Sequence, residues 1–262
     1  MKIAEHIDAL RAQGERLAGA AERAGLDTPV PTCAPWLVKD LLRHTGYIHR
    51  WAARHITERP GQILDGPPEA EILRGGAEDA GLLAWFRAGH GALTETLATA
   101  DPAVECATFM AAPSPLAFWA RRQAHETAIH RADAESAAGV TPGYQAGFAA
   151  DGIDELIMGF GRRRKYQPGS TADGARLRVL AADTGDAWSI EAHEGRLQPR
   201  RTDNPNSGPD DPEGAGCTVS GPASGVYLFL WNRADAAQAD VTVAGDPALL
   251  ASWQASVKVR WG

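Results

Sequence analysis

Apolar residues recur at intervals of three, four or seven through the first part of the chain, which is the spacing of amphipathic helices. This pattern predicts helices over about 2–25, 36–58, 79–100 and 145–164, and a further helix over about 115–138 is predicted from the residues at its two ends. Gly25 and the proline-bounded segment 29–35 separate the first two, and a polar stretch after Pro60 is predicted to be a loop. Ser114 followed by Pro115 is predicted to begin the fourth helix. A serine hydroxyl can cap the free backbone N–H groups there, and proline suits the first helical position.

The pattern changes after about residue 166. Residues 166–170 are predicted to be a linker, and short β-like runs follow at 177–180, 188–192 and 241–243. A very polar loop over 200–216 and two helical segments, about 221–233 and 246–257, complete the second part. Helices first and mixed elements afterwards predict an α+β protein of two domains: a helical bundle of the four-helix type over 1–165 and a small α/β domain over 166–262.

The charge and composition exclude several classes of protein. The net charge of −7 argues against nucleic-acid binding, because polyanions are bound through basic patches. The one basic run, at 162–165, is interpreted as the cationic end of a helix. Apolar runs are too short for a membrane span, and the first residues lack the apolar core of a signal peptide. Three widely separated cysteines form neither a disulfide framework nor a zinc knuckle, so we expect a cytoplasmic protein.

A possible metal site lies in the predicted fourth helix. Glu126 and His130 are four residues apart, so their side chains lie on one helical face and could bind one ion together. His125 is five residues from His130 and off that face, so this is not the zincin H-E-x-x-H motif. His44, in the middle of the second helix, is the best third ligand. The alternative is that Glu126 and His130 form a surface pair and that His44 is a core histidine.

Two segments of the bundle resemble mycothiol-dependent maleylpyruvate isomerase-like proteins, which belong to the DinB-like four-helix bundles. They are residues 31–44, PTCAPWLVKDLLRH, and residues 118–135, FWARRQAHETAIHRADAE. The stretch from 219–224 through 245–250 is similar to the family's small α/β second domain. The resemblance implies zinc or another divalent metal, bound by His44, Glu126 and His130. One departure is Leu37, where the family usually has Thr or Ser, and it weakens a helix cap.

The resemblance also implies a chemistry. Two His and one Glu leave an open position on zinc, which is the pattern of a catalytic site. The family's thiol is mycothiol, the small thiol of actinobacteria, and the preference for arginine over lysine suits such a GC-rich genome. The expected function is a zinc-dependent, mycothiol-using isomerase or S-transferase acting on an electrophilic small molecule. Arg233, matched to a family arginine with Asn232 in place of the usual Gly, would bind a substrate carboxylate.

Other functions and roles stay open at this point. The alternatives are a metal-dependent hydrolase of an amide or thioconjugate and a non-catalytic metal or small-ligand binding protein. His49 and His125 could be supporting hydrogen-bond donors or general bases, or could simply pack between helices. Cys33 could be a nucleophile or a small buried cysteine. Asp133 and Glu135 are expected to be solvated or paired with arginines, and four aromatic residues are expected in the core: Trp51, Trp85, Phe86 and Trp119.

Overall fold

The computed structural model of the chain describes residues 1–163, 173–202 and 216–256. Contacts between residues divide the chain into two compact units, Met1–Pro142 and the described part of Gly143–Arg260. Each unit is described by itself below. The predicted linker 166–170, the end of the basic run at 164–165 and most of the predicted loop 200–216 lie outside the described residues.

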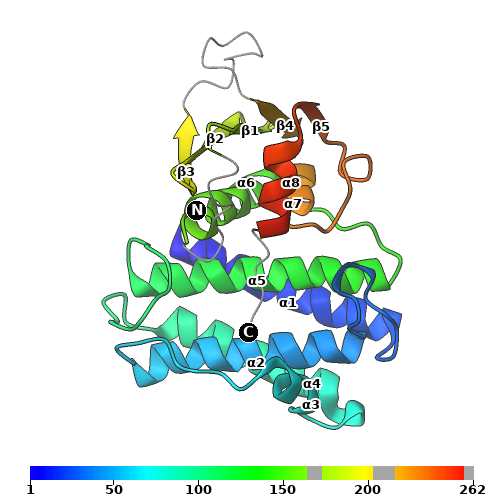
Figure 1. Cartoon of the computed structure of the whole chain (residues 1–262). Helices are drawn as coiled ribbons and strands as arrows, with labels where there is room; N and C mark the ends of the chain where they lie inside the picture. The colour runs from blue at the N-terminus through cyan, green and yellow to red at the C-terminus, as the bar shows by residue number, and fades with distance from the viewer. Residues whose placement is uncertain (164–172, 203–215, 257–262) are drawn as a thin grey trace. The chain divides into compact units, whose positions relative to one another are not determined.

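The first unit is a bundle of four long helices (Figure 1). Its helix α1 packs along α5, and α2 along α4, with further contacts of α1 with α4 and of α2 with α5. The helices span Ile3–Ala24 (α1), Val38–Glu58 (α2), Asp79–Thr99 (α4) and Pro115–Ala137 (α5). All four were predicted, the first three from the apolar period and α5 from its Ser114–Pro115 start and the Gly139 after its end. The loop predicted after Pro60 also contains a short helix, α3 (Glu69–Arg74), which the prediction missed because six residues show too little periodicity.

The helix ends follow from local chemistry. The Ser114 hydroxyl accepts a hydrogen bond from the Ala117 backbone N–H at 3.1 Å, which confirms the predicted cap of α5. At α2 the cap residue is Leu37, which has no side-chain acceptor. The Asp40 carboxylate instead accepts from the Leu37 N–H at 2.9 Å, so the first turn is still closed from within the helix.

The bundle has an apolar core cluster. Leu17, Leu41, Leu42, Leu82 and Phe86 are all buried in it. Trp51, Phe86 and Trp119 are buried as predicted. Trp85 is half-buried and packs against this cluster. The Arg50 guanidinium lies 3.8 Å from the centre of the Trp85 ring. It also donates to the backbone carbonyls of Gly46 and Trp85, so Arg50 of α2 is bonded to α4.

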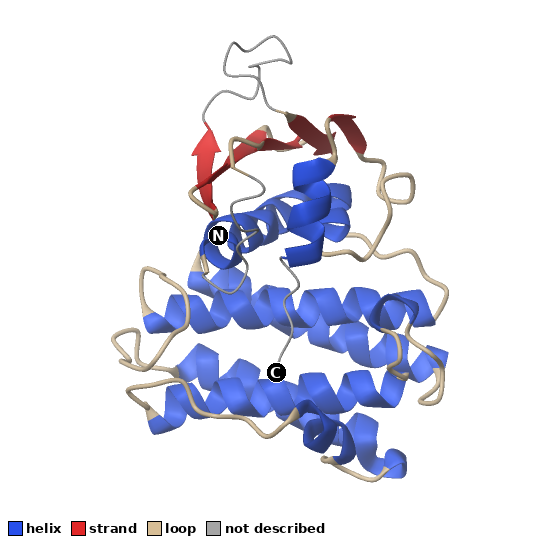
Figure 2. Ribbon diagram, viewed as in Figure 1, coloured by secondary structure: helices blue, strands red, loops and turns tan. Residues whose placement is uncertain are grey.

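The second unit contains a five-stranded sheet in its described part, in the order β3-β2-β1-β4-β5 (Figure 2). Strands β1 and β4 are parallel and the other neighbours antiparallel. The strands are Arg176–Ala181 (β1), Asp186–His193 (β2), Arg196–Thr202 (β3), Cys217–Gly221 (β4) and Thr242–Gly245 (β5). β1, β2 and β5 match the predicted runs. β3 and β4 were not predicted, because the edge strand β3 is mostly polar and β4 has only five residues.

The helices of this unit are shorter than predicted. α7 spans Ala223–Leu230 and α8 spans Ala248–Ser256. The predicted helix over 145–164 ends as an α-helix at Asp154, since α6 (Ala146–Asp154) continues into a π turn, η2 (Glu155–Gly159), and a 3-10 turn, η3 (Phe160–Arg162). α7 packs against α6, β1 and β4.

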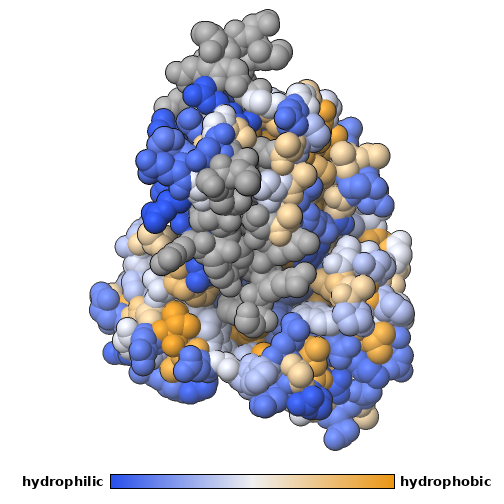
Figure 3. Space-filling model, in the orientation of Figure 1, coloured by the Kyte–Doolittle hydropathy of each residue, from blue (hydrophilic) through white to orange (hydrophobic). Residues whose placement is uncertain are grey.

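Hydrophilic residues cover most of the surface visible in Figure 3, with smaller apolar areas between them. Among the described residues, no helix combines the length and the hydrophobicity needed to cross a bilayer.

Candidate metal centre

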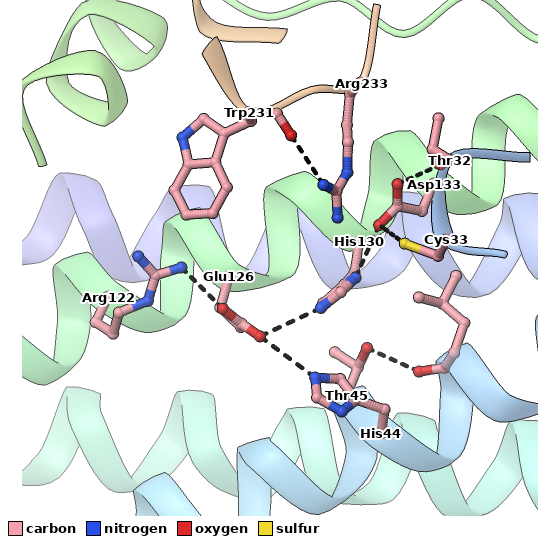
Figure 4. Close-up of polar contacts among 11 residues, drawn as sticks. Thr32, Cys33, His44, Thr45, Arg122, Glu126, His130, Asp133, Trp231 and Arg233 are labelled. Atoms are coloured by element: carbon pink, nitrogen blue, oxygen red, sulfur yellow. Dashed lines mark hydrogen bonds and ion pairs between the residues drawn. The ribbon is translucent and has the colours of Figure 1, made fainter. Parts of the chain in front are cut away.

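His44, Glu126 and His130 meet inside the bundle, between α2 and α5 (Figure 4). Oε1 of Glu126 lies 3.2 Å from Nε2 of His130 and 3.5 Å from Nε2 of His44. The three donor atoms all lie within 4.8 Å of one another. The side chains are buried, with exposed fractions of 1% for His44, 3% for Glu126 and 8% for His130. The structure therefore brings together the three residues predicted from helical spacing and from the family resemblance.

These residues fit a tetrahedral metal ion. Ligand atoms on zinc lie roughly 3.3 Å apart, given Zn–N and Zn–O bonds of about 2.0–2.2 Å, and the two observed separations are close to that value. Neither ring nitrogen of His44 has a hydrogen-bond partner among the described residues, although both are buried. A buried polar atom left unpaired costs about 1–3 kcal/mol. An ion bound at Nε2 would satisfy one of these atoms.

The protonation states suit a ligand set. Burial lowers the pKa of the His44 imidazole more than its contact with Glu126 raises it, so this ring is neutral and has a free lone pair. Burial alone would raise the pKa of Glu126, but its contacts with His130, His44 and Arg122 hold that pKa well below the usual value. Burial would also lower the pKa of His130, yet Asp133 and Glu126 raise it to about 9. An ion would therefore displace a proton from His130.

Arg122 holds the second oxygen of Glu126. Its guanidinium donates to Oε2 at 2.9 Å from one helical turn earlier in α5, and the arginine is fully buried. This hydrogen bond leaves Oε1 as the oxygen that faces the two histidines. Arg122 was not predicted as part of the site, although its four-residue spacing to Glu126 indicates an ion pair on one helical face.

Asp133 orients His130. Its Oδ2 accepts from Nδ1 of His130 at 2.9 Å, so Nε2 is the nitrogen that faces Glu126. The prediction that Asp133 is solvated or paired with an arginine is wrong. Its carboxylate is fully buried and also accepts from the Thr32 hydroxyl at 2.5 Å and the Cys33 thiol at 3.2 Å. The turn η1 (Pro31–Cys33) thus supports the ligand helix.

Glu135 is also buried, contrary to the expectation of a solvated carboxylate, and its pairing with arginines is confirmed. It binds Arg131 of the same helix and Arg16 of α1, the latter at 3.0 Å. The pair with Arg16 joins α5 to α1, and the pair with Arg131 lies within α5.

Trp36 lies next to two of the three proposed ligands. Its ring centre is 4.8 Å from that of His44 and 6.2 Å from that of His130, and the residue is half-buried. Trp36 was not predicted as part of the site, because a tryptophan between a proline and the start of a helix has no regular spacing to the proposed ligands. It forms an apolar wall beside the ligand atoms.

The other residues considered from the sequence have different surroundings. His49 is bonded to the Thr127 hydroxyl at 2.9 Å and packs against the rings of Phe86 and His90, as a core histidine does. The His125 ring lies 6.1 Å from that of His6. Cys33 is half-buried and donates to Asp133.

Arg233 belongs to the second unit, where it follows α7 and donates to the Trp231 carbonyl at 2.8 Å. Asn232 before it has a φ of 58°, a left-handed backbone that glycine and asparagine adopt most readily.

Comparisons with known proteins agree with this architecture. Two solved structures, the mycothiol-dependent maleylpyruvate isomerase and a mutant of it, each cover 93% of this chain and 93% of their own. Their TM-scores are 0.62 and 0.64 at 12% and 13% sequence identity, so the likeness is one of fold. No curated protein matches the sequence significantly.

Family models cover most of the chain. Residues 7–135 match the mycothiol maleylpyruvate isomerase N-terminal domain, and residues 147–252 match the MDMPI C-terminal domain. The first match contains the three proposed ligands together with Arg122 and Asp133, and the second contains Arg233. The α+β fold and both domain models together show that this chain belongs to the mycothiol maleylpyruvate isomerase family.

Proposed function

We propose that this chain is a metal-dependent isomerase that uses mycothiol to convert an electrophilic unsaturated acid between its cis and trans forms. One observation carries the proposal: three buried donor atoms from His44, Glu126 and His130 converge in a member of this family, and neither nitrogen of His44 has a hydrogen bond to any residue that the structure describes. The acid would be related to maleylpyruvate, the compound named for the two solved relatives.

The residues of the chain would prepare the site before any ligand arrives. Asp133 keeps a proton on Nδ1 of His130, which reserves Nε2 for the ion. Arg122 fixes Glu126 so that one oxygen points at both histidines. Three protein ligands leave a position free for a fourth, which distinguishes catalytic from structural zinc sites. A zinc ion held there would supply the positive charge that keeps a neighbouring thiol deprotonated at neutral pH.

The proposed reaction balances without a redox partner. The mycothiol thiolate adds to the carbon–carbon double bond, and the π electrons move onto the activating carbonyl group. Rotation about the resulting single bond follows, and expulsion of the same thiolate restores the double bond in the other geometry. Thiolate is consumed and regenerated, so mycothiol is a cofactor in the net reaction. If the adduct were protonated and released instead, the enzyme would be an S-transferase.

Arg233 is proposed to bind the carboxylate of the substrate, because a guanidinium offers two parallel hydrogen bonds to a carboxylate. Losing one such charged contact costs about 1.5–3 kcal/mol, or roughly ten- to a hundredfold in kcat/KM. Arg233→Ala should therefore reduce kcat/KM for the acid and leave the metal content unchanged.

Activity measurements test the thiol. Turnover of an unsaturated keto acid is compared with mycothiol, with glutathione and with no thiol, and the product is identified as an isomer or a conjugate. We expect isomerisation in the presence of mycothiol and none with glutathione or without a thiol. Equal rates in all three conditions would contradict the thiol mechanism and favour a zinc-water hydrolase. If no electrophile reacts, calorimetric titration with mycothiol decides: absence of binding would support a binding protein for other ligands.

Elemental analysis tests the metal. We expect about one divalent ion per chain in the wild type, with zinc as the preferred ion. His130→Ala removes a ligand and should lose the ion, and His44→Ala should weaken its retention. Full occupancy in both variants would contradict the assignment of the site. His193→Ala, a change at an exposed histidine of β2, is the matched control and should keep the ion.

A further inference from the structure

A second group of possible metal ligands lies on the other edge of the His130 ring. Sγ of Cys33, Nδ1 of His130 and a carboxylate oxygen of Asp133 gather around one point, all within 4.8 Å of one another. Oδ2 of Asp133 is 3.2 Å from Sγ and 2.9 Å from Nδ1 (Figure 4). These residues come from η1 and α5, so the whole group lies within the first unit.

We propose that Cys33, Asp133 and His130 form a second metal-binding set, suited to a thiophilic divalent cation such as Cd²⁺. A thiolate, an imidazole and a carboxylate are the donors that bind zinc and its softer relatives, and sulfur favours the softer ion. The set in which Glu126 and His44 take part has no sulfur. The two sets therefore differ in the ions that they should prefer.

The spacing of the donor atoms suits this role. Ligands on a tetrahedral zinc ion lie roughly 3.3–3.5 Å apart when one of them is sulfur with a bond of about 2.3 Å. The observed separations are hydrogen-bond distances and are a few tenths of an ångström shorter. The proton on Sγ and the proton on Nδ1 both point at Asp133. An ion that binds here would release these two protons to solvent, and the sulfur and nitrogen lone pairs that become free would coordinate the ion.

The surroundings hold the set in place and leave it reachable. The Thr32 hydroxyl donates to Oδ1 of Asp133, which leaves Oδ2 directed at the sulfur and at the imidazole. Cys33 is only half-buried, unlike Asp133. A cation could thus approach from the side of the η1 turn.

Sharing His130 makes the two sets exclude one another. A neutral imidazole has one nitrogen with a proton and one with a free lone pair. When Nε2 binds an ion together with His44 and Glu126, Nδ1 keeps its proton and donates to Asp133. When Nδ1 binds an ion together with Cys33, Nε2 carries the proton and the first set loses a ligand. A soft cation at Cys33 should therefore displace the ion of the proposed catalytic set.

Cadmium titration of the metal-free, full-length protein tests the proposal. A cadmium–thiolate bond absorbs in the near ultraviolet, so the absorbance reports on sulfur ligation directly. We expect the band to saturate at about one Cd²⁺ per chain. Cys33→Ser and Cys33→Ala should both lose it, and either variant suffices if the other does not fold. Cys106→Ser is the matched control, since Cys106 is another half-buried cysteine of the first unit, and it should keep the band.

Two outcomes would overturn the proposal: a wild type without the band, or Cys33 variants that retain it. A further variant separates this result from the proposed function. His44→Ala removes a ligand of the first set alone, so it should weaken zinc binding and keep the cadmium band. If zinc binding is unchanged in His44→Ala while the band still depends on Cys33, then the catalytic assignment fails and the second set stands.

Discussion

Asp133 accepts a hydrogen bond from Nδ1 of His130 at 2.9 Å, and both side chains are buried on the same helix, three residues apart. Because Nδ1 is bound to Asp133, Nε2 is the nitrogen of His130 that is available to an ion, and it lies 3.2 Å from Oε1 of Glu126. A neighbouring carboxylate that fixes the tautomer of a histidine ligand also raises its basicity. The orientation of His130 toward Glu126 thus depends on an acid three residues later in the same helix.

Replacing Asp133 by asparagine should weaken zinc binding about 10- to 100-fold, the usual effect of losing the partner of a histidine ligand. The affinity is measured by competition with a chromophoric chelator. Asp27→Asn is the control, because Asp27 is an exposed acid paired only with Lys39 among the contacts described here. Unchanged affinity in Asp133→Asn would contradict a positioning role for Asp133.

Replacing Arg122 by methionine should destabilise the metal-free protein, because the change leaves the carboxylate of Glu126 buried without its arginine. Breaking a buried ion pair in this way costs about 3–5 kcal/mol in the free energy of unfolding. The double variant Arg122→Met/Glu126→Gln should recover part of that loss, since neither member of this ion pair then leaves an unpaired charge in the core. Urea denaturation measures both. A double variant no more stable than the single one would show that Arg122 acts through packing.

The long elements and the proposed ligand residues were predictable from the sequence for identifiable reasons. α1, α2 and α4 each run for more than 20 residues and have an apolar period. α5 is buried on nearly every side, so it was recognisable from its Ser114–Pro115 start and the Gly139 after its end. Glu126 and His130 lie four apart in α5, and helical geometry alone places them on one face. His44 was selected from its place in the middle of a helix, and the resemblance to the family supported that choice.

What the sequence did not reveal depends on tertiary packing. An acid three residues after a histidine is the same pattern on an exposed helix and on a buried one, so Asp133 could not be distinguished from a surface residue. Its bonds to Thr32 and Cys33 join segments 100 residues apart in the sequence. β3 alternates in burial, but its two buried positions hold Leu197 and Pro199, and a proline argues against a strand except at the edge of a sheet.

The stability of the protein should fall with decreasing pH in part because of His49. Burial, reinforced by the nearby His90, lowers the pKa of His49 well below its ordinary value of 6.5. As the pH falls, His49 therefore takes up a proton in the unfolded chain before it does so in the folded protein. The contribution of neutral, buried His49 to stability is complete above about pH 6.5 and is lost progressively below it. The slope is about 1.4 kcal/mol for each pH unit until the folded-state pKa is reached.

Replacing His49 by glutamine removes this titration and retains a group that can bond to Thr127. The free energy of unfolding of His49→Gln should depend less steeply on pH between 6.5 and 5 than that of the wild type, by roughly one proton equivalent. His193→Gln, at an exposed position, should follow the wild type. Parallel pH profiles for His49→Gln and the wild type would show that His49 does not titrate in this way.

Two glycines of the second unit should respond in opposite directions to alanine. At Gly225 in α7, a Cβ atom would clash with the backbone oxygen of Ala239, so the helix would have to move. We expect a loss of about 1–3 kcal/mol or more for Gly225→Ala. At Gly147 in α6 a Cβ atom would meet none of the described residues within 4 Å, and alanine should stabilise the helix by about 0.5–1 kcal/mol. Thermal unfolding distinguishes the two; a neutral Gly225→Ala would contradict the close approach.

The proposed metal site should survive removal of the second domain. All three ligands, and the Arg122 and Asp133 side chains that orient them, belong to the unit Met1–Pro142, whose four helices pack on one another. We predict that a fragment of residues 1–165, the boundary expected from the change in sequence pattern, is helical by circular dichroism. We also predict that it binds zinc within about tenfold of the affinity of the full chain, because no ligand is lost. The same fragment with His130→Ala is the control and should not bind. A fragment that is insoluble, or folded but without zinc binding, would show that the bundle and the second domain depend on a common core.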